Sequence, residues 1–341
     1  MSALKIIDPG LLTTVQDFGR GGAQRYGVPV SGVRDREAMV LANALVGAPI
    51  DQAVLELGYV GPAFLVQTDT LEIALVGAEM QIEVMRDGET RVFPDRRTIP
   101  LKRGDRVRCG ALRGAPSACL ALSCGVDLPL VLNSQATFAK GSFGGFRGRA
   151  LAQGDRLPLG GAMPPGQILC LPAPFPAAPA QTIRVVLGPQ EDHFTPEAVE
   201  TFLTRPWQVT QEADRMGLRL DGPRLSHAKG YNVTSDAIVT GSIQVPGSGQ
   251  PIIMLVDRQT SGGYPKIATV ITADLPALAR FSPGASFHFA AVSASEGAHL
   301  ARARAAEMAE LLASIAPWRP SGQIDEAALY RENLISPPIL D

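Results

Sequence analysis

A polar loop, DRQTSGGYPK, lies between two apolar runs of the chain and extends from Asp257 to Lys266. The flanking runs, 252–256 and 267–271, have the composition of buried strands. A plain hairpin needs a loop of only about two to five residues. The amide, hydroxyl and charged groups of this longer loop suit the orientation of a small carbonyl compound and the stabilisation of a developing oxyanion. The pattern therefore predicts a ligand loop carried by a β scaffold.

This loop supplies most of the predicted site. Catalytic roles are predicted for Asp257, Gln259, Thr260 and Lys266. Substrate-binding roles are predicted for Gln244, in the upstream segment GSIQVPGSGQP, and for Gly262, Gly263 and Tyr264. The glycine pair permits a positive φ or a close backbone approach. The alternative is an ordinary surface loop in which Asp257 and Lys266 form an ion pair worth under about 1 kcal/mol.

A second cluster of polar side chains lies in the glycine-rich segment TTVQDFGRGGAQRYGVPVSGVRD, residues 13–35. Backbone N–H groups in such a segment can approach a carboxylate or phosphate closely, and an arginine can clamp the anion with two hydrogen bonds. The predicted substrate-binding residues here are Gln16, Asp17, Arg20 and Ser31. In the alternative structural interpretation the glycines form turns, Asp35 caps a helix and Arg20 pairs with Asp17.

The composition narrows the class of protein. The chain has 341 residues, 45% of them hydrophobic, and a net charge of −2. It is long enough for two domains, and its charge pattern does not indicate nucleic-acid or membrane-surface binding. No apolar run reaches the length of a membrane span, and the N-terminus lacks a signal-peptide core, so a cytoplasmic protein is expected. The four cysteines and four histidines have no metal-ligand spacing, and no metal site is predicted.

Several standard catalytic motifs are missing from the sequence. There is no GxxxxGK[ST] phosphate loop, no GxGxxG after a strand, no GxSxG nucleophile elbow and no Met-Lys-Met biotin attachment site. If ATP or biotin takes part in the reaction, it must be bound unconventionally or at a site shared with a partner.

The elements that must position these residues are mainly strands. High glycine and proline content, 35 and 28 residues, favours many turns. Residues 53–160 resemble a β meander, with a hairpin turn at Asp87-Gly88. Helices are predicted over 36–46, 196–204, 274–281 and 295–315, the first capped by Asp35 and the second by Thr195. Strand content should exceed helix content about twofold.

A Pro/Ala-rich stretch, LPAPFPAAPAQ, divides the chain. The expected organisation is an N-terminal β-rich domain (1–172), a linker (173–182), a C-terminal β domain (183–294) and a C-terminal helix with its tail (295–341).

Several long motifs carry a resemblance to a known family. GLLTTVQDFGRGG, GVPVSGVRD, DRMGLRLDGP, GSIQVPGSGQPI and DRQTSGGYPKIATVI occur in the order typical of the allophanate hydrolase subunit 2 family, and the resemblance extends over about residues 4–293. It implies a β-rich fold of the cyclophilin-like barrel type. Together with the predicted helices, the expected fold is mainly β, with two β-barrel-like (cyclophilin-like) domains, a few short helices and one long C-terminal helix. The resemblance also implies a KipI-like subunit 1 protein as a partner.

Three functions follow from this resemblance, and the residues do not separate them. As the C subunit of a 5-oxoprolinase, the chain would act with a KipI-like B subunit, together with a YcsF-like A subunit, to open 5-oxo-L-proline to L-glutamate. ATP would then be bound jointly with those partners. As a carboxyltransferase component, the chain would transfer carboxylate from biotin on a separate protein to urea or a related amide. As a KipA-like regulator, it would bind a KipI-like protein without catalysis.

Overall fold

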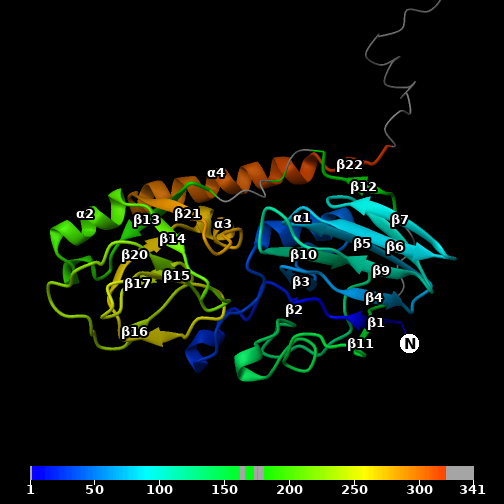
Figure 1. Ribbon diagram of the computed structural model, residues 1–341, viewed down its shortest axis with the longest axis horizontal. Coiled ribbons are helices and arrows are strands. Elements are labelled where there is room, and N and C mark those ends of the chain that lie inside the picture. The colour runs from blue at the N-terminus through cyan, green and yellow to red at the C-terminus, as the bar shows by residue number, and fades with distance from the viewer. Residues whose placement is uncertain (1, 162–165, 173–174, 176–179, 320–341) are drawn as a thin grey trace, which may run out of the picture.

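The structure, a computed structural model, describes residues 2–161, 166–172, 175 and 180–319. Strands account for 35% and helices for 18%, so the predicted mainly β fold is confirmed. Figure 1 shows two β-rich parts, which we call the N-terminal half (residues 2–161) and the C-terminal barrel (residues 182–291). The helix α4 (Ala294–Ala313) extends across both parts.

The N-terminal half is built from two sheets. Its strands are β1 (Ala3–Asp8), β2 (Leu12–Gln16), β3 (Val54–Gly58), β4 (Ala63–Val66), β5 (Thr70–Val76), β6 (Gln81–Arg86), β7 (Glu89–Pro94), β8 (Ile99–Lys102), β9 (Arg106–Cys109), β10 (Ser117–Leu122) and β11 (Arg156–Pro158). One sheet has the order β11-β1-β4-β9-β6-β7 and the other β2-β3-β10-β5-β8. Apolar side chains of both sheets form one core, which includes Phe64 and Leu120. In the described residues neither sheet closes into a barrel.

The first helix covers the five-stranded sheet on the face opposite this core. Helix α1 (Arg36–Leu45) begins at the predicted cap, where the Asp35 carboxylate accepts a hydrogen bond from the Ala38 N–H at 3.0 Å. Its apolar face packs on Val54 of β3 and on neighbouring strands. Because side chains alternate along a strand, Glu56 emerges on the same face of β3 as Val54, toward the helix side of the sheet.

The C-terminal half contains a closed barrel with the strand order β13-β20-β17-β18-β15-β14-β21. Its strands are β13 (Thr182–Leu187), β14 (Trp207–Val209), β15 (Gly217–Asp221), β17 (Ser242–Gln244), β18 (Ile252–Met254), β20 (Lys266–Val270) and β21 (Ser286–Ala291). A separate two-stranded sheet joins β16 (Asp236–Ala237) to β19 (Ser261–Gly262). The barrel core includes the fully buried Trp207 and Phe202.

The barrel order explains the length of the polar loop. Strands β18 and β20 do not pair with each other, because β17 lies between them. The loop from Asp257 to Pro265 must therefore cross the end of β17, and it forms β19 on the way. It is a crossing connection rather than a hairpin, and both of its anchors are strands of the closed barrel.

The remaining elements are short. They are α2 (Pro196–Thr204), α3 (Leu275–Leu278), the 3-10 helices η1 (Ala23–Tyr26), η2 (Ala139–Gly141), η3 (Glu191–His193) and η4 (Thr272–Asp274), and the paired strands β12 (Leu169–Cys170) and β22 (Ala316–Pro317). The predicted helices correspond to α1, α2, α3 and α4.

Most of the expected linker, and the tail beyond residue 319, lie outside the described residues. Phe175 is buried, and the Arg280 guanidinium lies 4.6 Å from its ring centroid.

A buried ion cluster joins α1 to the C-terminal elements. The Arg280 guanidinium donates to Asp35 and to Glu37, each at 2.9 Å, and all three side chains are at most 9% exposed. Arg304 of α4 donates to the same Glu37 at 2.6 Å and 2.7 Å. Since Asp35 also caps α1, this cluster fixes the start of that helix against the barrel and α4.

We expect Arg280→Ala to lower the free energy of unfolding by about 3–5 kcal/mol, because it leaves the buried Asp35 carboxylate without its cation. Arg103→Ala is the matched control, since Arg103 pairs with Asp69 in a solvent-exposed pair worth at most about 1 kcal/mol. Urea denaturation of both variants measures the difference. Equal and small losses would show that the cluster does not hold the halves together.

Candidate active site

A pocket of about 470 Å³ opens beside the barrel strands β15, β17 and β18. This volume lies in the range of small-molecule sites. Its lining is polar at many positions and comprises Lys140, Glu212, Asp214, Met216, Gly217, Arg219, Gln244, Pro246, Ile252, Met254, Gln259 and Tyr264. Every lining residue except Lys140 belongs to the C-terminal part of the chain. The pocket therefore lies where the two halves meet.

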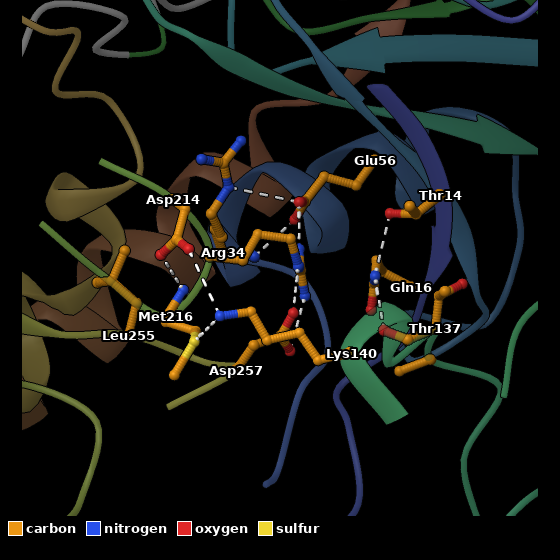
Figure 2. Close-up of polar contacts among 12 residues, drawn as sticks. Thr14, Gln16, Arg34, Glu56, Thr137, Lys140, Asp214, Met216, Leu255 and Asp257 are labelled. Carbon is orange, nitrogen blue, oxygen red and sulfur yellow. Dashed lines mark hydrogen bonds and ion pairs between the residues drawn. The ribbon is translucent and has the colours of Figure 1, made fainter. Parts of the chain in front are cut away.

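Lys140 reaches the pocket from the N-terminal half. It belongs to η2, in a loop whose residues Ser142, Gly144, Gly145, Arg147 and Gly148 all have positive φ. In Figure 2 its side chain points toward Asp214 and Met216. The Nζ contacts the Met216 sulfur and lies 3.9 Å from the Asp214 carboxylate.

Strand β2 and the glycine-rich turn that follows it hold the Lys140 loop in place. The Gln16 side-chain amide donates to the Thr137 carbonyl at 3.2 Å, and the Arg20 guanidinium donates to the Ala136 carbonyl. Asp17 accepts hydrogen bonds from the Ser134 hydroxyl and the Gln135 N–H, both at 2.6 Å. These bonds stabilise the loop that carries Lys140, so the three residues act here as positioning groups.

The pairing of Arg20 with Asp17, which the alternative structural interpretation required, is not formed among the described residues, and Arg20 remains partly unsatisfied. Its guanidinium is fully buried with the ring centroid of Phe143 4.8 Å away, and neither Nε nor Nη1 has a hydrogen-bond partner in the part of the chain that the structure describes. Burial lowers the pKa of Arg20, against the attraction of Asp17 and Asp257. Gln16 Oε1 and the Ser31 hydroxyl are likewise buried without a hydrogen-bond partner among the described residues. Anion binding by Gln16, Asp17, Arg20 and Ser31 stays a prediction.

A second set of charged groups links the pocket wall to the N-terminal half. The Arg215 guanidinium donates to the Asp257 carboxylate at 2.8 Å, to the Gly32 carbonyl at 2.7 Å and to the Glu56 carboxylate. The Arg34 backbone N–H donates to Glu56 at 2.7 Å, and its guanidinium lies 3.4 Å from the same carboxylate. We call these four side chains, Arg34, Glu56, Arg215 and Asp257, the Arg215 cluster.

The charges of the Arg215 cluster stabilise one another. Burial alone would raise the pKa of Glu56, but the attraction of Arg215 and Arg34 outweighs it, and the pKa of Glu56 is lowered. Burial alone would lower the pKa of Arg215, but Glu56 and Asp257 outweigh it, and the pKa of Arg215 is raised. The pairing therefore favours the charged forms of both Glu56 and Arg215.

Three of the predicted site residues line the pocket: Gln244, Gln259 and Tyr264. Gln244 is 2% exposed, and its amide donates to the Tyr264 carbonyl at 3.2 Å. Gln259 and Tyr264 are exposed to solvent at the pocket. Their amide and phenol groups can donate to a carbonyl oxygen and accept from an N–H. This arrangement suits the orientation of a small amide or lactam.

The other predicted residues of the loop lie outside the pocket lining, and the structure gives them structural contacts. Asp257 does not pair with Lys266, because its carboxylate is bound by Arg215. Lys266 is 3% exposed, and its Nζ donates to Asp236 at 2.5 Å and to the Ala237 carbonyl at 2.9 Å. It thus fastens β16 to barrel strand β20. Catalytic roles for Asp257, Thr260 and Lys266 remain predictions.

The glycine pair serves close packing, since neither glycine is among the residues with positive φ. A Cβ on Gly262 would lie 2.7 Å from Ile238 Cδ1 and 2.9 Å from Gln244 Nε2. The Gly263 carbonyl accepts a hydrogen bond from the Val233 N–H at 2.9 Å. Gly262 therefore supports Gln244 from behind, which is the close backbone approach expected of it.

Sequence reasoning missed Lys140, Arg215 and Glu56 as site residues. A glycine-rich segment like the predicted one was visible around Lys140, in FAKGSFGGFRGR. Arg215 belongs to the motif DRMGLRLDGP, but nothing in the sequence links it to Glu56, because the pair joins residues 159 positions apart.

The described residues also bear on metal sites, membrane-spanning helices and further pockets. They contain no group of three or more His, Cys, Asp or Glu placed to hold a metal ion. No helix within the described ranges is long and apolar enough to cross a membrane. A second pocket of about 460 Å³ adjoins the first and shares Glu212, Arg219, Pro246 and Ile252 with it.

Fold and site together define a β-rich protein with a small polar pocket where a closed barrel meets a second β-rich half. Residues 26–291 match the family model of the carboxyltransferase domain, subdomain A and B. The chain belongs to this carboxyltransferase-domain family. The match includes the barrel, Lys140 and the whole pocket lining, whereas Gln16, Asp17 and Arg20 precede it.

Similar proteins come from bacteria and yeasts. The chain is 35% identical to the C subunit of 5-oxoprolinase from Escherichia coli over 302 residues, covering 86% of this chain and 92% of that protein. It is 33% identical to urea amidolyase of Lachancea kluyveri, covering 85% of this chain but only 17% of that protein. The crystal structure of Kluyveromyces lactis urea carboxylase superposes with a TM-score of 0.81 at 29% identity, over 95% of this chain and 30% of that one.

We expect Gly144→Ala to destabilise the loop that carries Lys140. Gly144 has φ +71°, and a Cβ there would collide with the Ala136 carbonyl and with Arg20 Nη2. Gly154→Ala is the matched control, because Gly154 has φ +87° with nothing near its Cβ, so it adds only backbone strain of about 1–2 kcal/mol. Denaturation should show a clearly larger loss for Gly144→Ala, and equal losses would contradict the packing described here.

Acid should weaken the Arg215 cluster through Glu56. Because the folded chain lowers the pKa of Glu56 below its ordinary value of 4.5, the carboxylate stabilises the fold above that pH, and the contribution is lost as pH falls through the lowered pKa. Glu56→Gln should reduce stability at pH 7 and flatten its decline between about pH 5 and pH 2. Urea denaturation across this range measures both effects. Parallel stability curves for wild type and variant would argue against the pairing.

Proposed function

We propose that this chain is the C subunit of an ATP-dependent 5-oxoprolinase complex that opens 5-oxo-L-proline to L-glutamate. The observation that carries the proposal is the 35% identity to the C subunit of E. coli 5-oxoprolinase along 92% of that protein. A second relative with the same name, from Haemophilus influenzae, is 33% identical over 94% of its length. The pocket with Gln244, Gln259 and Tyr264 is consistent with a small lactam as ligand.

In this proposal the chain contributes substrate orientation, and the reaction adds water across the lactam C–N bond. The side-chain amides of Gln244 and Gln259 and the Tyr264 hydroxyl hold the lactam carbonyl and N–H. Donors fixed in this way lower the barrier by favouring the charge that develops on the carbonyl oxygen. Gln244 is suited to this role because its amide is held on both sides, by the Tyr264 carbonyl and by the packing of Gly262.

ATP does not suit the pocket itself. The two cations of the lining, Lys140 and Arg219, are matched by two carboxylates, Glu212 and Asp214, so no net positive charge is left for a triphosphate. The sequence also lacks a phosphate loop. We therefore place ATP binding on partner proteins or on a surface shared with them, and the proposed partners are a KipI-like B subunit plus a YcsF-like A subunit.

The second candidate function is a carboxyltransferase component acting on urea or a related amide. The observation that favours it is the likeness to K. lactis urea carboxylase, at a TM-score of 0.81. In that case biotin would be carried by a separate protein, because this chain has no Met-Lys-Met motif. Urea is itself a small amide, so the same pocket would serve both reactions.

The decisive experiment uses the complex that a tagged copy of the full chain retrieves from its native cells. We expect it to contain a KipI-like protein and to release glutamate from 5-oxo-L-proline only with ATP. ATP- and bicarbonate-dependent consumption of urea, without glutamate release, would favour the second function. Turnover of neither substrate by a complex that contains the KipI-like protein would favour a regulator. Full 5-oxoprolinase activity of the isolated chain would contradict its proposed place within a complex.

Gln259→Ala tests the pocket within that complex. Gln259 is exposed, so we expect its loss to change stability by less than about 0.5 kcal/mol. Activity should nevertheless fall at least about tenfold in kcat/KM, or about 1.4 kcal/mol of transition-state stabilisation. Gln81→Ala, at an exposed glutamine on β6, is the control and should leave activity unchanged. If a normally assembled Gln259→Ala complex turned over substrate at the wild-type rate, the active site would lie elsewhere.

A further inference from the structure

We propose that Lys140 binds a carboxylate on the substrate and thereby selects a carboxylated amide or lactam over a neutral amide such as urea. The inference rests on the proposed function and deepens it, because it assigns a specificity-determining residue to the same pocket. It follows from which charged side chains around the pocket already have a partner of opposite charge.

Lys140 has unused hydrogen-bonding capacity. An ammonium group has three donors. Within the described ranges its Nζ has two polar neighbours, the Met216 sulfur and the Asp214 carboxylate. A thioether is a weak acceptor, and the 3.9 Å to Asp214 is too long for a hydrogen bond. The side chain is 60% exposed, so it can turn toward a ligand in the pocket that it lines.

The other charges of the pocket are already engaged. Arg219 pairs with Glu212 at 3.2 Å. The Asp214 carboxylate accepts the N–H groups of Met216 and Gly217 at 2.7 Å and 3.1 Å, which shapes the turn before β15. Of the two cations that line the pocket, Lys140 therefore lies farther from its nearest carboxylate, at 3.9 Å against 3.2 Å for Arg219. An anionic group on the ligand would satisfy it.

The neutral polar side chains of the pocket are suited to bind an amide. Gln244, Gln259 and Tyr264 come from the barrel, whereas Lys140 comes from the N-terminal half. A ligand with a carboxylate at one end and an amide at the other would satisfy both sides at once. 5-Oxo-L-proline has both groups on one small ring, and urea has only the amide.

Lys140 also has the fixed support that recognition requires. Its loop is tied down three and four residues earlier, where Thr137 and Ala136 accept hydrogen bonds from Gln16 and Arg20. The Thr137 N–H and hydroxyl both donate to the Val15 carbonyl, at 2.9 Å and 3.0 Å. The flexible side chain thus extends from a fixed base, so its loss should affect the ligand carboxylate and leave the pocket wall in place.

The test compares 5-oxo-L-proline with 2-pyrrolidinone, the same lactam without the carboxylate, in the assembled complex. Lys140→Met should raise KM for 5-oxo-L-proline at least tenfold and leave the inhibition constant of 2-pyrrolidinone within twofold. Lys140→Arg should restore most of the affinity, because it keeps the positive charge. Lys229→Met is the matched control, since Lys229 is similarly exposed, pairs with Asp192 and does not line the pocket.

The results distinguish the role of Lys140 from the proposed function of the chain. Suppose that the wild-type complex opens 5-oxo-L-proline while Lys140→Met weakens the binding of both compounds equally, or of neither. In that case the role of Lys140 is overturned and the proposed function stands. If Lys140→Arg is as impaired as Lys140→Met, charge recognition is likewise overturned. If the wild-type complex does not act on 5-oxo-L-proline at all, the proposed function fails and this inference fails with it.

Discussion

The Arg215 guanidinium is the interaction on which the arrangement of the site depends. It joins Glu56, on the five-stranded sheet, to Asp257, shortly after barrel strand β18, and it also donates to the Gly32 carbonyl. With Arg34 the cluster contains two carboxylates and two guanidinium groups, so no net charge is left in a buried place. Removing one partner would leave an uncompensated buried charge, which is far more costly than losing an exposed ion pair. The two halves are therefore held in one relative position.

This constraint has a direct consequence for the pocket. Arg215 immediately precedes Met216, which lines the pocket and contacts Lys140. Fixing Arg215 against the N-terminal sheet therefore fixes the pocket wall against the loop that carries Lys140. The segment from Gln16 to Arg20 holds the same loop from the other side. A site shared between two β-rich halves thus gains the fixed geometry that substrate orientation requires.

Local signals in the sequence predicted the fold better than the site. The helix caps at Asp35 and Thr195 and the Asp87-Gly88 turn act over a few residues, and the corresponding elements are present. The loop from Asp257 to Lys266 was recognised by its composition, yet only Gln259 and Tyr264 of it line the pocket. The partners of Asp257 and Lys266 depend on which segments the barrel brings together, and Arg215 and Asp236 are distant in sequence. Lys140 was missed for the same reason, because its part in the pocket arises only when the halves meet.

The most direct test of a site at this meeting point is hydrogen–deuterium exchange of the assembled complex with and without 5-oxo-L-proline. We expect ligand-dependent protection in three separate segments, around residues 138–142, 214–217 and 259–264, because all three border the same pocket. Protection confined to another surface, such as the pocket formed by residues 79–83 and 108–113, would contradict this expectation.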